Sequence, residues 1–176
     1  MDHHIPKRRV PVTYWCSERG EAHGQIFLDL DPTGGRHRTV LAWLNSPSRF
    51  IPVVTDPDGR IELVDRSRWR RLVPGPEVSQ GDVFAHGVSP WREEDAEVWL
   101  TDGSSMVGRV RMPLERPTQR LSDFLNRLGS DWFVLRQGPV TQLVNGAAVT
   151  RVVPAPVDVV RLTSRGSRTS EDAILS

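Results

Sequence analysis

Residues 96–112 read AEVWLTDGSSMVGRVRM and predict a β-hairpin. Alternating apolar and polar residues are typical of strands with one buried face. Asp102-Gly103 between the two runs is a tight-turn signal, because glycine accepts a positive φ. We expect Arg109 and Arg111 to face outward. The residues expected to face inward are Ala96, Val98, Leu100, Val110 and Met112.

The same pattern occurs twice in the chain. Trp15 is followed nine residues later by Gly24, and Trp99 is followed nine residues later by Gly108. Each copy continues with a short helical phrase, at 40–45 and at 121–126, and then with an aromatic residue that opens a strand. The order of matched features never changes, and the length differences fall in turns. We therefore predict two copies of one module, at residues 8–75 and 94–154.

Each copy is expected to contain five short strands. In the second copy they are predicted at 96–102, 106–112, 132–137, 140–145 and 148–153, with the helical phrase between the second and the third. Five strands in about 60 residues cannot bury one face of a flat sheet, whereas a small barrel removes most exposed edges. The predicted fold is mainly β, with two tandem five-stranded small barrels and short helical turns produced by an internal duplication.

The second copy carries a resemblance to known small barrels. Its strand order, with a short helix after the second strand, resembles the SH3-like and Sm-like barrels. The run RLSDFLN at 120–126 is similar to an uncharacterised bacterial small-barrel family. The resemblance covers residues 96–154 and, more loosely, 10–74, and it implies a fold without a specific activity. Its Sm-like part implies RNA binding, but the paired Asp-x-Asn and Arg-Gly motifs of Sm RNA sites are not found.

The composition limits the class of protein. Of the 176 residues, 38% are hydrophobic and 26% are charged, which is typical of a globular chain. A net charge of +1 argues against a protein that binds nucleic acid over its whole surface. The single cysteine, Cys16, excludes a disulfide framework. No apolar run approaches the roughly 20 residues that span a bilayer, so we expect a cytoplasmic protein without membrane contact.

The segments outside the two copies are expected to be simple. Residues 76–93 are predicted to be an acidic linker, with a capped helical turn at 89–94. Residues 155–176 are predicted to supply one extra strand and then a disordered tail rich in Ser, Thr and Arg. Equivalent surfaces of duplicated modules often pair about a pseudo-two-fold axis, and we expect the two modules to meet in this way.

The sequence contains no recognisable catalytic constellation. Gly34-Gly35 is a turn pair rather than a phosphate loop, and no Gly-x-Ser-x-Gly elbow is present. The five histidines lack the helical spacing of a metal pair. We therefore predict that the protein is not an enzyme and has no catalytic residues, no cofactor and no metal.

Two groups of residues are candidates for contacts. Trp15 and Trp99 take the same outward position in the first strand of each copy, which favours a surface for a partner or for the other module. Alternatively, each ring covers the end of its own barrel. The second group is basic and surrounds one tryptophan: Arg66, Arg68, Trp69, Arg70 and Arg71. These residues can contact nucleic acid, but nearby carboxylates dilute the positive field and favour a closing strand with Trp69 inward.

The sequence as a whole favours a non-enzymatic bacterial protein that mediates protein–protein interaction, as a scaffold or adaptor built from duplicated small barrels. Its expected partner is another protein or a second copy of itself. The alternative is an RNA-binding Sm-like protein that uses an arginine-rich barrel surface. Strongly salt-dependent binding to generic RNA would favour the alternative, because phosphate contacts weaken steeply with salt.

Overall fold

The structure is a computed structural model that describes residues 7–29, 37–85, 87 and 90–155. In these residues ten strands form one antiparallel sheet, in the order β10-β6-β7-β8-β9-β5-β1-β2-β3-β4. The order is linear, so β10 and β4 are the two ends of an open sheet. The prediction of a mainly β protein is confirmed, and the helices are short.

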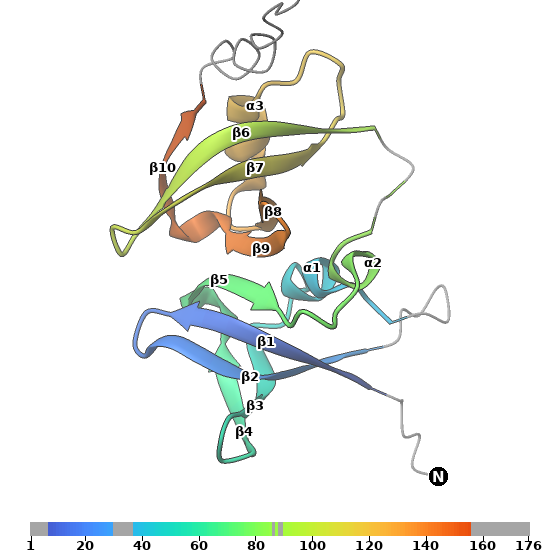
Figure 1. The fold of residues 1–176 in the computed structure, drawn as a ribbon, viewed down its shortest axis with the longest axis vertical. Helices are drawn as coiled ribbons and strands as arrows, with labels where there is room; N and C mark the ends of the chain where they lie inside the picture. Colours follow the sequence, from blue (N-terminus) through green and yellow to red (C-terminus); the bar gives the residue numbers. More distant parts are fainter. Residues whose placement is uncertain (1–6, 30–36, 86, 88–89, 156–176) are drawn as a thin grey trace, which may run out of the picture.

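The chain forms two halves of similar construction, which are stacked in Figure 1 with β5 and β9 at the junction. The N-terminal half consists of β1 (Arg8–Cys16), β2 (Gly20–Leu28), α1 (Val40–Leu44), β3 (Phe50–Thr55), β4 (Arg60–Asp65), the 3-10 turn η1 (Arg66–Arg68) and β5 (Trp69–Pro74). A short helix, α2 (Gln80–Val83), follows. The C-terminal half consists of β6 (Trp91–Leu100), β7 (Ser105–Pro113), α3 (Leu121–Leu128), β8 (Trp132–Gln137), β9 (Val140–Asn145), the 3-10 turn η2 (Gly146–Ala148) and β10 (Val149–Pro154).

The two halves share their strand order and their register. In each half the fifth strand pairs with the first, and the first, second, third and fourth then follow in sequence. The first strand places one residue between a glycine of the second strand and a proline of the fifth. The aligned triplets are Gly24–Val12–Pro74 and Gly108–Ala96–Pro154. A helix lies between the second and third strands of each half, where the two helical phrases were expected.

The predicted inward faces are confirmed. Val98 and Val110 are fully buried, and the other expected inward residues of 96–112 are at most 2% exposed. The prediction that Arg111 faces outward is wrong, because its side chain is only 8% exposed. Its guanidinium carbon lies 3.6 Å from the ring centroid of Trp91 and 4.6 Å from that of Phe84. The alternation of apolar and polar residues in one strand cannot predict contacts with two aromatic rings that are distant in the sequence.

The segment expected to be a linker is partly structured. β6 begins at Trp91 and pairs with β7 from Trp91–Pro113 to Trp99–Ser105, so the predicted helical turn at 89–94 is wrong. The long strand pairing provides hydrogen-bond partners for backbone N–H and C=O groups that a single helical turn would leave unpaired. The short helix α2 forms earlier in the segment, with Ser79 as its N-cap. The extra strand and tail predicted after Ala155 lie outside the described residues.

The halves do not meet about the expected pseudo-two-fold axis. They are joined by unlike strands, because β5 of the N-terminal half pairs with β9, the fourth strand of the C-terminal half. The paired residues are Arg71 with Val144 and Leu72 with Leu143. A junction between unlike surfaces is heterologous, in contrast to the self-complementary contact of a two-fold pair.

Gly108 provides a test of the shared register. A Cβ at Gly108 would lie 2.5 Å from the Arg136 carbonyl oxygen on β8, and a backbone atom there has little room to move. We expect Gly108→Ala to lower the free energy of unfolding by about 1–3 kcal/mol, the usual cost of overpacking. Denaturant unfolding measures it, with Val107→Thr as the control, because Val107 is 67% exposed. Equal losses in both variants would show that the close approach is unimportant.

Candidate interaction surface

The outer face of β8 and β9 is buried against the N-terminal half. Trp132, Val134 and Leu143 are 4%, 3% and 0% exposed, and they belong to the core that β1–β5 form. Phe133 and Val144, on the opposite face of the same strands, belong to the separate core of the C-terminal half. Burial of each large apolar side chain contributes roughly 1.5–3 kcal/mol. The two halves therefore stabilise each other through this strand pair.

Two asparagine side chains satisfy backbone groups across the junction. Asn45, at the end of α1, accepts a hydrogen bond from the Trp132 amide at 2.7 Å and donates one to the Trp132 carbonyl at 3.1 Å. Asn145 donates from Nδ2 to the Trp69 carbonyl at 2.8 Å, and its Oδ1 accepts from the Ala147 amide at 3.0 Å. A side-chain amide has both a donor and an acceptor, so asparagine suits both positions.

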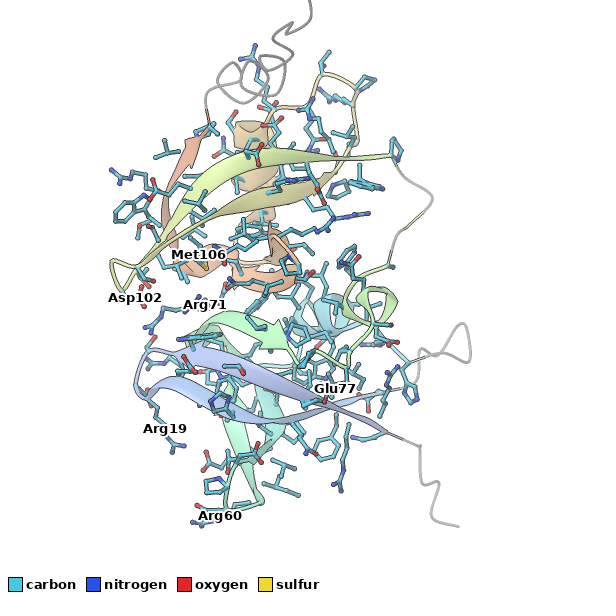
Figure 2. All side chains as sticks on the ribbon, in the orientation of Figure 1. Arg19, Arg60, Arg71, Glu77, Asp102 and Met106 are labelled. Carbon is cyan, nitrogen blue, oxygen red and sulfur yellow. The ribbon has the colours of Figure 1, made fainter. Side chains whose placement is uncertain are left out.

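Arg71 connects the first strand of one half to the other half. Its guanidinium carbon lies 3.7 Å from the ring centroid of Trp15. Its Nη1 donates to Gln142 Oε1 at 3.3 Å and lies 3.6 Å from the Met106 sulfur. Burial lowers the pKa of Arg71, and Asp102 partly opposes that shift. Figure 2 shows Arg71 at the junction, on the side of Met106 and Asp102.

The aromatic member of the predicted basic cluster is not available for stacking. Trp69 is 0% exposed and stacks on Tyr14, with 4.3 Å between the ring centroids. A nucleobase has no access to either face of a ring buried in this way. The structure agrees with the interpretation of β5 as a closing strand with Trp69 inward.

The arginines of this cluster are divided between intramolecular contacts and solvent. Arg70 forms a salt bridge with Asp102 across the junction, with 3.1 Å between Nε and Oδ2. Arg66 donates to the Ser46 carbonyl within the N-terminal half. Arg68 is exposed. The cluster therefore contributes to the junction between the halves through Arg70 and Arg71.

Trp15 and Trp99 occupy equivalent places but do not meet. Each ring lies beneath an arginine from the fifth strand of its own half, Arg71 over Trp15 and Arg151 over Trp99, the latter at 4.5 Å. The strands β7, β8, β9 and β5 lie between β6 and β1 in the sheet. Trp15 is linked to the junction through Arg71, which contacts both its ring and Gln142.

Exposed apolar side chains gather on the outer face of β3 and β4. Phe50, Ile61 and Leu63 are 55%, 69% and 70% exposed. Leu63 pairs with Pro52 across the two strands, which places both on one side of the sheet. We call this surface, formed by Phe50, Pro52, Ile61 and Leu63, the β3–β4 face.

The β3–β4 face is the counterpart of the buried outer face of β8 and β9. Phe50 pairs with Asp65 as Trp132 pairs with Asn145, so Leu63 corresponds to Leu143. The sequence prediction did not single out this surface. The signal was nevertheless present, because both copies keep large apolar residues at strand positions that face away from their own core.

A cleft of 370 Å³ also lies between the halves. Its walls are mainly apolar and include Phe84, Trp91, Phe124 and Trp132. Arg111 lines the cleft with its guanidinium between the Phe84 and Trp91 rings, and burial lowers its pKa. Because both rings already contact this cation, the cleft belongs to the packing between the halves.

The described residues contain no group of three or more His, Cys, Asp or Glu side chains placed to hold a metal ion. In the same part of the chain, no helix is long and apolar enough to cross a membrane. Compared with family models, curated proteins and solved structures, the chain matches none of them. The β3–β4 face is the candidate site that the geometry of the chain itself identifies.

Two asparagines, Asn45 and Asn126, form a pair for testing the junction. Asn45→Ala would leave the Trp132 amide and carbonyl without their side-chain partner, and we expect a loss of about 1–3 kcal/mol in the free energy of unfolding. Asn126 lies within α3, six residues after the N-cap of that helix, as Asn45 lies six residues after the N-cap of α1, and it is exposed. At low protein concentration Asn126→Ala should change stability by less than about 0.5 kcal/mol. Similar effects in the two variants would argue against a special role for Asn45.

Proposed function

We propose that this chain is a non-enzymatic protein-interaction or scaffold protein, built from two tandem SH3-like/Sm-like small barrels that arose by internal duplication. The shared strand order and the aligned glycine–proline registers of the two halves support the duplication. The short helix between the second and third strands of both halves agrees with this assignment. The proposed setting is the bacterial cytoplasm.

The observation that carries the proposal is the exposure of the β3–β4 face. Its counterpart in the C-terminal half packs against the other half of the same chain, because Trp132 and Leu143 lie in the core of the N-terminal half. Phe50 and Leu63 keep apolar side chains at the same places and leave them in solvent. Exposed apolar groups that gather on one face mark contact surfaces more often than isolated ones do. The face is therefore proposed to dock on another protein surface.

RNA binding has less support. Its aromatic platform, Trp69, is buried against Tyr14. Arg70 and Arg71 contact residues of the C-terminal half, which reduces the free positive charge of the cluster. The β3–β4 face, in contrast, is apolar and accessible.

A pull-down from native cell extract tests the proposed function. The immobilised chain is compared with Leu63→Arg, which places a charge at the centre of the face, and with Val107→Arg, which changes an equally exposed apolar residue on β7. We expect Leu63→Arg to reduce bound protein about tenfold or more, as for a central contact residue, and Val107→Arg to leave it unchanged. Equal recovery with both variants, or release of the bound proteins by nuclease, would contradict the proposal.

A further inference from the structure

The packing between the two halves is incomplete at the cleft that Arg111 lines. The walls of this cleft come from both halves. Leu41 of α1 and Phe84, which belongs to the N-terminal core, line one side, and Trp91 of β6 and Phe124 of α3 line the other. Its volume of 370 Å³ lies within the range of roughly 300–1,000 Å³ that is typical of small-molecule sites. A mainly apolar cleft between two folded units, with few polar groups, is a usual setting for such a site.

Aromatic rings form much of the wall, and one of them is open to solvent. Trp91 is 45% exposed, although one of its faces contacts Arg111. Phe124 meets Phe133 edge to face, with 6.3 Å between the ring centroids, and both rings line the cleft. A flat aromatic ligand can add stacked and edge-to-face contacts of the same kind to its hydrophobic burial. The walls therefore favour an aromatic ligand.

Arg111 sets the charge that the ligand should carry. Its side chain is 8% exposed, and burial lowers its pKa. A buried cation is costly unless an anion lies close to it. The rings of Phe84 and Trp91 contact the faces of the guanidinium, whereas its five N–H donors point outward in its plane. Five donors allow a carboxylate to bind in that plane beside other contacts of the same group.

The charged groups next to Arg111 favour an added negative charge. Glu93 raises the pKa of Arg111 and Arg136 lowers it, so both groups act on this cation electrostatically. Glu93 also forms salt bridges with Arg136 at 3.3 Å and with Arg109 at 3.7 Å. Arg109 has a second carboxylate, Asp95, at 3.7 Å. Arg111 and Arg136 therefore share one carboxylate, and a ligand anion would balance the second positive charge.

A carboxylate in the wall limits the ligand to one negative charge. Asp131 lines the cleft, is exposed, and partly opposes the lowering of the pKa of Arg66 by burial. A second negative group on the ligand would meet this carboxylate and would have to lose its hydration in an apolar cleft. A monoanion is therefore favoured over a phosphate dianion.

We propose that the cleft binds a small aromatic monocarboxylate, with its ring against the aromatic walls and its carboxylate on Arg111. Because the ligand contacts both halves, its binding also stabilises their junction. The proposed site is separate from the β3–β4 face, since Phe50, Ile61 and Leu63 are not among the described residues that line the cleft. Ligand binding is thus a further property of the chain, independent of protein docking at that face.

Isothermal titration calorimetry of the full chain with two probes of the same shape tests the role of charge. 2-Naphthoate carries the carboxylate, and 2-naphthamide is its neutral counterpart. We expect 2-naphthoate to bind with a Kd on the order of 0.1 mM, which is an ordinary affinity for a ligand of this size. We expect 2-naphthamide to bind about tenfold more weakly, because a hydrogen bond between charged groups is stronger than one with a neutral partner.

Three variants locate the site. Arg111→Met keeps a long apolar side chain and removes the charge, so it should weaken 2-naphthoate about tenfold and remove the difference between the probes. Ala85 is exposed and lines the cleft, so Ala85→Trp should obstruct it and abolish binding of both probes. Val107→Trp adds the same ring to an exposed position on β7 and should bind both probes as the wild type does.

Several results would overturn the inference. Absence of 2-naphthoate binding at millimolar concentration would do so. Equal affinity of the wild type for the two probes would indicate adsorption to apolar surface without a role for Arg111. Unchanged binding by Ala85→Trp would place the ligand elsewhere. Circular dichroism and unfolding midpoints check that each variant folds, and if Arg111→Met does not, the two probes on the wild type and the matched tryptophan variants still decide.

Leu63→Arg separates this inference from the proposed function. It changes the β3–β4 face and should bind 2-naphthoate with the affinity of the wild type. If the pull-down shows no role for Leu63 while 2-naphthoate binds as expected, protein docking at that face fails and the ligand site stands. If Leu63→Arg loses its protein partners while the wild type binds neither probe, the ligand site fails and the proposed function stands.

Discussion

A strand pair that is apolar on both faces must be covered on both sides, and β8–β9 is such a pair. Phe133 and Val144 face one core, while Trp132 and Leu143 face the other. The rest of the architecture follows from this requirement, because β5 and α1 must lie against the outer face. The pairing of β5 with β9 and the bonds from Asn45 hold them there. Hydrophobic burial supplies most of the stabilisation, and the polar contacts fix the register.

Local features of the fold could be predicted from the sequence, whereas the contacts between distant elements could not. Alternation in 96–112 predicted which residues face the core, and the two helical phrases appear as α1 and α3. Alternation identifies the inner face of a strand, but it does not say what covers the outer face. The joining of β5 to β9 and the burial of Arg111 between two rings therefore escaped prediction.

The candidate site was overlooked for a related reason. Trp15 and Trp99 were predicted to form a contact surface because they are large outward residues, but each ring is covered by an arginine of its own half. In the sequence Phe50 and Leu63 are ordinary strand residues. They become candidates for a contact surface because their counterparts in β8 and β9 are buried against the N-terminal half. In a chain with two similar halves, comparing how equivalent surfaces are used is more informative than the chemistry of single residues.

The shared core has a consequence for synthesis on the ribosome. The N-terminal half emerges first, and its core lacks Trp132, Val134 and Leu143 until the C-terminal half has left the exit tunnel. Until then the nascent chain presents the bare edge of β5 beside an unfilled apolar groove, which is the kind of surface that chaperones recognise. Completion of the first half thus waits for translation of the second, and premature termination before Leu143 would release a polypeptide prone to aggregate.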